Sequence, residues 1–277
     1  MRFLLLVLVA ACSHPHEPTL MERLSGPLEP FRVVGNVYDV GASNIASYAI
    51  VTPAGIILID TLTPELNDRL LANFEKVGLH ARDVKIVLCS HAHFDHVGGH
   101  AAIVRASGAK VMVMHEDAEA VHTGKDLSPL ADDTRWTPVT IDRELADGDT
   151  VELGGQTLTA IKAPGHTPGC TVWRTTIHDD RDYDVVFYGC SRPNDSVKLH
   201  GNPKFPTLIA DTEATFAKMR ALSPDIFLTM HPEDEFAPVI DKLRAGVKPN
   251  PLADKAAWPK QLDEVEADFR AALAKER

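Results

Sequence analysis

The stretch of the chain that most restricts its possible folds is "SHAHFDHVGGH", residues 90–100. It follows "VKIVLC", an apolar run of strand length that is typical of a strand buried on both faces. Four histidines and one aspartate therefore lie in a loop at the end of a buried strand, where α/β folds commonly place functional groups. Imidazole nitrogens and carboxylate oxygens are typical Zn²⁺ ligands. The spacing differs from the i, i+4 histidine pair of a zinc-protease helix.

Two more histidines also lie at the ends of predicted strands. His166 lies in the tight turn "APGHTPGC", and His231 directly follows "DIFLTM". Alone, each would more often be an ordinary loop residue. The four candidates between His91 and His96 are too crowded for one ion, however, and fit two adjacent ions completed from elsewhere in the chain. His100 falls in the next helical pattern, and we expect a structural role for it.

The rest of the chain alternates between strand-like and helix-like patterns. Short runs rich in β-branched residues, such as "IASYAIVT" and "CTVWRTTI", predict strands, and "ELGGQTL" predicts a hairpin. Helical spacing covers 64–77, 98–107, 212–221 and 262–277. Hairpins interrupted by helices predict an α/β fold of two packed β-sheets with helices outside. Residues 31–277 contain no linker or repeat, so we expect a single catalytic domain there.

The N-terminus predicts export from the cytoplasm. Residues 1–12, "MRFLLLVLVAAC", are typical of a short export signal. The end of this segment resembles a lipobox, in which Cys12 would carry a lipid anchor; ordinary signal cleavage is the alternative. We therefore expect a periplasmic protein, either free or anchored as a lipoprotein. Residues 13–30 are rich in proline and polar residues and are interpreted as a tether.

Charge and cysteine content restrict the partners. The chain has 28 Lys+Arg against 39 Asp+Glu and a net charge of −11, which argues against binding to nucleic acid or an anionic membrane surface. The cysteines beyond Cys12 are widely spaced and do not indicate a disulfide framework; they are Cys89, Cys170 and Cys190. We expect a monomer that acts on a small molecule.

With these motifs, the chain resembles the metallo-β-lactamase superfamily, whose HxHxDH signature is His91 to His96, and within it the third subclass of class B β-lactamases. The resemblance runs from about 29 to 245, and "GNPKFP" and "TMHP" favour that subclass. It implies an αβ/βα four-layer sandwich of two mixed β-sheets with helices on both outer faces. It also implies two Zn²⁺ ions. The first would be held by His91, His93 and His166. The second would be held by Asp95, His96 and His231.

The resemblance implies a zinc-dependent β-lactamase that hydrolyses penicillins, cephalosporins and carbapenems and so confers antibiotic resistance. The nucleophile would be a zinc-activated water, oriented by Asp95 as the catalytic residue. Asp60, which ends "GIILID", would hydrogen-bond into the ligand loop; a simple turn residue is the alternative. A lactonase or thioester hydrolase of the same fold is the rival function. A non-catalytic zinc-binding lipoprotein is a more distant one.

The segment "YGCSRP" departs from the pattern of the subclass. Cys190 falls where the subclass usually has a serine, and it could be an additional or substitute zinc ligand, a free thiol beside the site or a packed cysteine. Ser191 and Arg192 are predicted to contact the substrate. The Arg192 guanidinium would pair with a substrate carboxylate; an ordinary loop arginine is the alternative.

Overall fold

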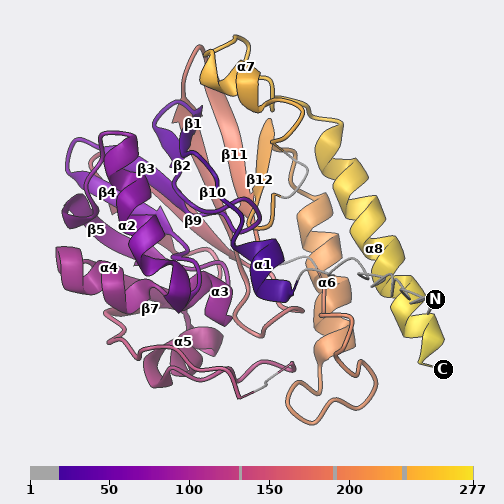
Figure 1. Ribbon diagram of the computed structural model, residues 1–277. Helices are drawn as coiled ribbons and strands as arrows, with labels where there is room; N and C mark the ends of the chain where they lie inside the picture. Colours follow the sequence, from indigo (N-terminus) through magenta and orange to yellow (C-terminus); the bar gives the residue numbers. More distant parts are fainter. Residues whose placement is uncertain (1–18, 131–132, 190–191, 233–235, 277) are drawn as a thin grey trace, which may run out of the picture.

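The computed structural model describes residues 19–130, 133–189, 192–232 and 236–276. Two β-sheets pack face to face, and helices cover the outer face of each sheet, which gives four layers (Figure 1). Both sheets contain parallel and antiparallel pairs. The expected αβ/βα sandwich of two mixed sheets is therefore confirmed.

The first sheet has seven strands in the order of the chain. They are β1 (Phe31–Val34), β2 (Val37–Asp39), β3 (Tyr48–Thr52), β4 (Gly55–Ile59), β5 (Val84–Leu88), β6 (Lys110–Met114) and β7 (Arg143–Leu145). The first four strands pair antiparallel, and β4 to β7 pair parallel. The apolar sides of three helices pack against its outer face; these are α2 (Asn67–Lys76), α4 (His100–Ser107) and α5 (His115–Thr123).

The second sheet has five strands in the order β12-β11-β10-β9-β8. They are β8 (Thr150–Leu153), β9 (Gln156–Lys162), β10 (Thr171–His178), β11 (Asp182–Tyr188) and β12 (Ile226–Thr229). Only β11 and β12 pair parallel in this sheet. Its outer face is covered by α6 (Leu208–Arg220) and α8 (Ala257–Lys275), whose Met219, Trp258 and Leu262 pack against Val172 and Val186.

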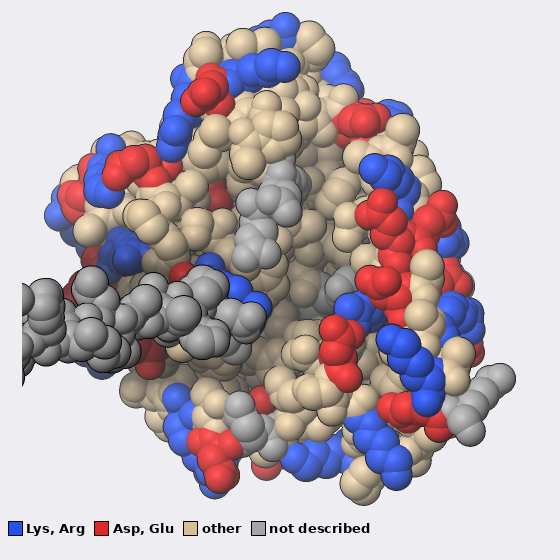
Figure 2. Space-filling model, turned by 45° about the vertical axis from the view of Figure 1, so that its right-hand side comes forward, with Lys and Arg blue, Asp and Glu red and all other residues tan. Residues whose placement is uncertain are grey.

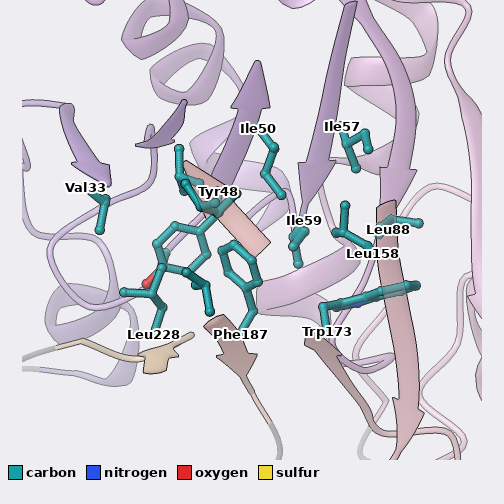
Figure 3. Close-up of a cluster of buried hydrophobic side chains, with 14 of the residues drawn as sticks. Val33, Tyr48, Ile50, Ile57, Ile59, Leu88, Leu158, Trp173, Phe187 and Leu228 are labelled. Carbon is teal, nitrogen blue, oxygen red and sulfur yellow. The ribbon is translucent and has the colours of Figure 1, made fainter. Parts of the chain in front are cut away.

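The main core lies between the two sheets (Figure 3). Ile57, Ile59 and Leu88 of the first sheet face Trp173 and Phe187 of the second, and all five are fully buried. Each such side chain contributes about 1.5–3 kcal/mol through removal of apolar surface from water. The Trp173 indole also donates a hydrogen bond of 3.0 Å to the carbonyl of Cys89. The second sheet is thus tied to the chain just before the ligand loop.

Several helices differ from the sequence prediction. The helix predicted over 64–77 begins with a 3-10 turn, Pro64–Leu66, ahead of α2, and the Thr63 side chain makes no capping bond. Helices α6 and α8 begin at Leu208 and Ala257, four and five residues before the predicted starts. Three short elements that no apolar pattern indicated also form; they are η2 (Ala81–Asp83), α3 (Phe94–Val97) and α7 (Ile240–Arg244).

The described part of the expected tether is not extended. A capping box between Thr19 and Glu22 begins the short helix α1 (Leu20–Leu24), and Leu24 is buried in the core beneath the first sheet. The carbonyl of Gly26 accepts a hydrogen bond from the backbone of Ser43. The chain therefore packs against the domain from Leu24 onward.

The surface carries charges of both signs close together. Figure 2 shows acidic and basic side chains side by side on the face that it presents. Two of the ion pairs link α6 to α8; they are Arg220–Glu266 and Arg270–Glu213. Exposed pairs of this kind contribute about 0–1 kcal/mol each, so the packing beneath them determines the position of α8. None of the described helices is long and apolar enough to cross a membrane.

Candidate metal centre

The predicted ligands lie at one edge of the sandwich, where strands of both sheets end. Asp60 follows β4, the HxHxDH loop follows β5, and His231 comes two residues after the last residue of β12. His166 lies in the turn between β9 and β10. The single-turn helix α3 contains Asp95 and lies at this edge (Figure 1). The topology therefore brings four separate chain segments to one place.

Tight packing explains the two glycines that close the ligand loop. Gly99 lies directly against the 61–67 segment, and a Cβ atom on it would come within 2.2 Å of the carbonyl oxygen of Thr61. The Thr61 hydroxyl also hydrogen-bonds the Nδ1 atom of His100 at 2.7 Å. His100 is fully buried and points into this packing contact. The expected structural role of His100 agrees with that position.

All six candidate ligands converge in two groups of three. In each group the candidate ligand atoms lie within 4.8 Å of one another. The first group is His91, His93 and His166. The second group is Asp95, His96 and His231. The groups adjoin, because the ring centroids of His91 and His96 are 4.0 Å apart.

In the first group, a protein partner fixes one nitrogen of each ring. The partners are Ser90 Oγ for His91 Nδ1 at 3.0 Å, Ser128 Oγ for His93 Nε2 at 2.9 Å, and the Arg192 carbonyl for His166 Nδ1 at 2.9 Å. The other nitrogen of each ring is thereby left for the interior of the group. His91 Nε2 is buried and has no hydrogen-bond partner among the described residues. Such an atom is costly unless a ligand satisfies it, so the donor set fits a metal ion.

In the second group, too, a protein partner fixes one nitrogen of each imidazole ring. His96 Nδ1 bonds to Asp60 Oδ2 and His231 Nδ1 bonds to the Asn44 carbonyl, each at 2.8 Å. Both Nδ1 atoms must donate to these oxygen acceptors, so both Nε2 atoms present lone pairs when the rings are neutral, as they are when they bind a metal ion. These two atoms lie 3.2 Å apart, and Asp95 Oδ2 lies within 3.6 Å of both. Two lone pairs beside a carboxylate need a shared cation, which is again what a metal ion supplies.

The Asp60 carboxylate supports ligand rings of both groups through hydrogen bonds. Its carboxylate accepts hydrogen bonds from the backbone and hydroxyl of Ser90, each at 2.7 Å, and from His96. Since the Ser90 hydroxyl donates to Asp60, it must accept from His91 Nδ1. One carboxylate therefore orients a ring in each group. Asp60 is fully buried and has φ of 61°, a conformation that costs about 1–3 kcal/mol in a non-glycine residue.

In the first group, lowered pKa values keep the imidazole rings of His91 and His166 neutral, so their nitrogen lone pairs remain available to a metal ion. Burial, with the neighbouring histidines, lowers the pKa of His91 well below its usual value and that of His166 to about 3. In the second group, burial alone would raise the pKa of Asp95, but His96 and His231 bring it well below its usual value. Burial alone would lower the pKa of His96, but Asp95 and Asp60 raise it to about 10. The second group is thus strongly attractive to a cation.

Comparison with known proteins identifies the family. A family model described as the metallo-beta-lactamase superfamily matches residues 40–231, which is more than half of the chain. The chain belongs to the metallo-beta-lactamase superfamily. It is therefore a metal-binding hydrolase, and the predicted family and enzyme class are confirmed.

Two solved members of the superfamily are similar over almost their whole length. The native FEZ-1 metallo-beta-lactamase from Legionella gormanii is 36% identical, with a TM-score of 0.86 and coverage of 91% of this chain and 97% of that one. BJP-1, a subclass B3 metallo-beta-lactamase of Bradyrhizobium japonicum, is 35% identical, with a TM-score of 0.84 and coverage of 93% and 98%. The predicted likeness to the third subclass is confirmed by these neighbours.

Curated relatives carry a different name. A protein named hydroxyacylglutathione hydrolase from Hyphomonas neptunium is 30% identical over 175 residues, which is 58% of this chain and 60% of that protein. A second of that name, from Anaeromyxobacter dehalogenans, is 30% identical over 190 residues, or 68% of this chain and 60% of that protein. The chain thus spans about three fifths of the length of these relatives.

The main chain and the side chain of Arg192 contact different parts of the molecule. Its carbonyl holds His166, but its guanidinium pairs with Asp195 and lies 3.9 Å from Asp268. The side chain lines a cavity of about 570 Å³ beside α8. Two protein carboxylates therefore surround the group that we predicted to pair with a substrate carboxylate. Cys190 and Ser191 lie outside the described residues.

The structure describes two of the cysteines, and their states differ. Cys170 is disulfide-bonded, although the spacing of the cysteines indicated no disulfide framework, and its partner lies outside the described residues. Cys89 is free and buried behind the ligand loop, and burial raises the pKa of its thiol well above the usual value. A single cross-link is not a framework, and wide spacing in sequence does not exclude one in a β-sandwich, where strand ends meet.

Three supporting residues were missed in the sequence. Ser90 precedes the HxHxDH motif directly, and its position next to a ligand was the one available signal. Ser128 and Asp126 lie in the loop after α5; Asp126 accepts a 2.8 Å hydrogen bond from the Ser128 backbone and lies 4.0 Å from His93 Nε2. No periodicity or motif marks that pair, because their contact with His93 depends on the fold alone.

Proposed function

We propose that the chain is a zinc-dependent β-lactamase that binds two Zn²⁺ ions and hydrolyses the β-lactam amide bond of penicillins, cephalosporins and carbapenems. One observation carries this proposal. Two adjoining three-ligand groups, each with its rings oriented by protein hydrogen bonds, occupy the strand ends of a chain that resembles two structures named metallo-beta-lactamases over more than nine tenths of their length. Antibiotic resistance would be the biological consequence.

Each ion would have three protein ligands and an open position, as catalytic zinc sites do. His91, His93 and His166 would hold the first ion, and Asp95, His96 and His231 the second. Zinc bound in this way lowers the pKa of a coordinated water towards neutrality and polarises a substrate carbonyl.

The chain's own residues would then orient the reaction. Asp95 stays ionised at neutral pH, because His96 and His231 hold its pKa low, and it can orient the attacking water by accepting a hydrogen bond from it. Its side chain is 12% exposed, so solvent and substrate can reach it. The five imidazoles are held by Ser90, Ser128, Arg192, Asp60 and Asn44, which limits reorganisation during the reaction.

A thioester hydrolase is the second candidate function. The observation in its favour is the similarity to curated proteins named hydroxyacylglutathione hydrolase. The alignment spans only 60% of those proteins, whereas the likeness to the two lactamase structures spans 97% and 98% of them. The longer coverage favours the lactamase.

Parallel assays distinguish the candidates. The mature protein would be assayed with a penicillin, a cephalosporin, a carbapenem, a hydroxyacyl-glutathione thioester and a lactone, each with added zinc and with chelator. We expect zinc-dependent turnover of the three lactams, at least 100-fold faster in kcat/KM than that of the thioester. The reverse ratio would assign the thioester hydrolase. Asp225→Ala, which removes a buried carboxylate at the opposite end of β11 and β12, is the control and should retain the lactam preference.

We further propose that residues 1–12 direct export to the periplasm and that the mature enzyme is a monomer. The apolar segment ending at Cys12 supports export, although it lies outside the described residues. Cell fractionation of the wild type and of Cys12→Ser tests both forms of the idea. A shift from the membrane to the soluble periplasmic fraction in the variant would indicate a lipid anchor, and soluble wild type would indicate ordinary cleavage. Retention in the cytoplasm would contradict export.

A further inference from the structure

A buried carboxylate outside the ligand groups joins the loops that carry the first group. Asp117 lies in the first turn of α5 and is 3% exposed. Its Oδ2 atom accepts hydrogen bonds from the backbone of Ala92 at 2.9 Å and from the hydroxyl of Thr167 at 2.6 Å. Its Oδ1 atom accepts from the backbone of Gly169 at 2.8 Å. One side chain thus engages two loops separated by more than 70 residues.

The three donors surround the three ligands of the first group. Ala92 lies between His91 and His93, and Thr167 directly follows His166. The orienting hydrogen bonds described above fix the rotation of each ring, but they do not fix the distance between the two loops. Asp117 is the described side chain that bonds to both loops next to their ligands.

The chain is shaped to admit this carboxylate. A Cβ atom on Gly169 would lie 2.6 Å from the Asp117 Cγ, so only glycine allows the turn after His166 to approach so closely. The first residue of β10, Thr171, donates a backbone hydrogen bond of 2.7 Å to Ser90, which ties the loops together on the other side of the ligands. That bond holds the strand ends, whereas Asp117 holds the ligand-bearing turns themselves.

The charge of Asp117 fits the same role. Burial raises its pKa to about 6, and the hydrogen bonds from Thr167, Ala92 and Gly169 oppose that rise. Three donors directed at two oxygens require a carboxylate acceptor, because an amide would turn its NH₂ group towards one of them. Asp60 supports a ring in each group, whereas the hydrogen bonds of Asp117 described above go to the loops around the first group.

We propose that Asp117 is a positioning residue for the first metal-ligand group, holding the His91–His93 loop and the His166 turn at the separation that one ion requires. The inference rests on the proposed function only in requiring that a metal ion binds to this group. It predicts a selective effect, in which loss of the Asp117 carboxylate weakens binding at the first group and leaves the second group unchanged.

Metal affinity measured by competition with a chromophoric chelator tests this selectivity, together with the visible spectrum of the Co²⁺-substituted protein. In Asp117→Ala we expect binding at the first group to weaken about 10–100-fold, as for other residues that orient metal ligands. The second ion should bind within about threefold of wild type. In a His231→Ala background, which leaves only the first group complete, Asp117→Ala should weaken the remaining site to the same degree and alter its Co²⁺ spectrum.

Two milder variants guard against a failure to fold. Asp117→Asn keeps the volume and can still accept from Ala92 and Thr167, and Thr167→Val removes a single donor. Both should weaken the first site by smaller factors than Asp117→Ala. Asp225→Ala is the matched control, because Asp225 is also buried and accepts a backbone hydrogen bond, from Asp184, far from the ligands. It should lower thermal stability without changing either metal affinity.

Wild-type affinity and Co²⁺ spectrum in Asp117→Ala and Asp117→Asn would overturn the inference, as would equal weakening of both groups. The result is independent of the substrate. Wild-type protein that binds two ions but hydrolyses no lactam would refute the proposed function, while the metal affinities would still decide the role of Asp117. Wild-type protein that binds no metal would overturn both.

Discussion

The Nε2 atoms of His96 and His231 lie 3.2 Å apart, although the Nδ1 atom of each ring is already committed to an oxygen acceptor. The two rings come from different sheets, one after β5 and the other after β12. Their approach is therefore a product of the whole fold. Two neutral rings in this arrangement need a cation between them, a proton in the metal-free protein or a metal ion, and the adjacent Asp95 carboxylate favours a divalent metal ion.

Removal of one ligand from each group should release one ion. His166→Ala should reduce zinc content from two ions to one at micromolar protein and equimolar chelator, because the first group then has two ligands. His231→Ala should do the same for the second group. Elemental analysis by mass spectrometry after gel filtration measures the content. Two tightly held ions in either variant would show that the groups are assigned wrongly.

The Asp60 carboxylate should matter to both groups. In Asp60→Asn, one oxygen is replaced by an NH₂ group, so the amide cannot accept from the Ser90 backbone at the Oδ1 position and from the Ser90 hydroxyl and His96 at the Oδ2 position at once, and the support of the His96 and His91 rings is weakened. We expect metal affinity at both groups to fall by about 10–100-fold and kcat/KM to fall at least as far. Chelator competition and steady-state kinetics provide the measurements. A variant with wild-type metal affinity would mean that Asp60 is only a turn residue and does not support the metal ligands.

The buried His100 should make the metal-free protein sensitive to acid. Burial lowers its pKa to about 3, against 6.5 in the unfolded chain, so the unfolded state binds more protons between those values. Stability is fully present above pH 6.5 and is lost as the pH falls below it. Between pH 7.5 and 5 the wild type should lose about 2 kcal/mol more than His100→Asn does.

Urea unfolding in the presence of chelator at the two pH values provides that comparison, and His200→Asn, at an exposed position, is the control. Equal losses in the wild type and His100→Asn would show that His100 does not carry the effect. A wild type more stable at pH 5 would reverse the sign and contradict the account of its burial.

Cysteine connectivity decides among the three interpretations of Cys190. Peptide mapping without reduction should find Cys170 cross-linked and Cys89 as a free, buried thiol. A Cys170–Cys190 peptide would exclude Cys190 both as a thiolate ligand and as a free thiol. A free Cys190 that is protected from alkylation by zinc would instead support the ligand interpretation. A free Cys170 would contradict the structure.

A fully buried aromatic side chain between the two sheets should contribute strongly to the stability of the fold. Phe187→Ala removes a fully buried ring between the two sheets (Figure 3), which should destabilise the protein by about 3–5 kcal/mol. Phe227→Ala, on the half-buried outer side of β12, should cost clearly less. Denaturant unfolding of both variants with zinc present measures the difference. Equal costs would indicate that the space between the sheets is not the main core.

The sequence alone predicted the features that a short stretch of chain makes visible, such as apolar runs and clustered histidines. Alternating and continuous apolar runs located most of the strands, and the density of histidines between residues 91 and 96 identified the ligand loop. The hairpin at Gly154 was predicted correctly because a glycine pair between two strand-like runs has few other structures. In each case the signal lies within a short window of the chain.

What the sequence did not reveal depends on contacts between distant segments. Helix α5 was missed because "HEDAEAVHT" carries few large apolar residues, and its inward face is made of alanines and one valine. Asp117 and Ser128 had no local pattern, since each bonds to the ligand loop from more than 20 residues away, Asp117 at the Ala92 backbone and Ser128 at the His93 ring. The Arg192 side chain was expected to pair with a substrate carboxylate, but in the structure it pairs with Asp195 and lies near Asp268 of α8, a helix that begins 65 residues further along.

The central claim is that two bound zinc ions make this chain a β-lactamase. Titration of metal-free protein with zinc, following hydrolysis of a carbapenem at each step, tests it most directly. We predict activity that rises until two equivalents have bound and that chelator abolishes. Saturation of both sites without lactam turnover, or equal turnover in the metal-free protein, would contradict the claim.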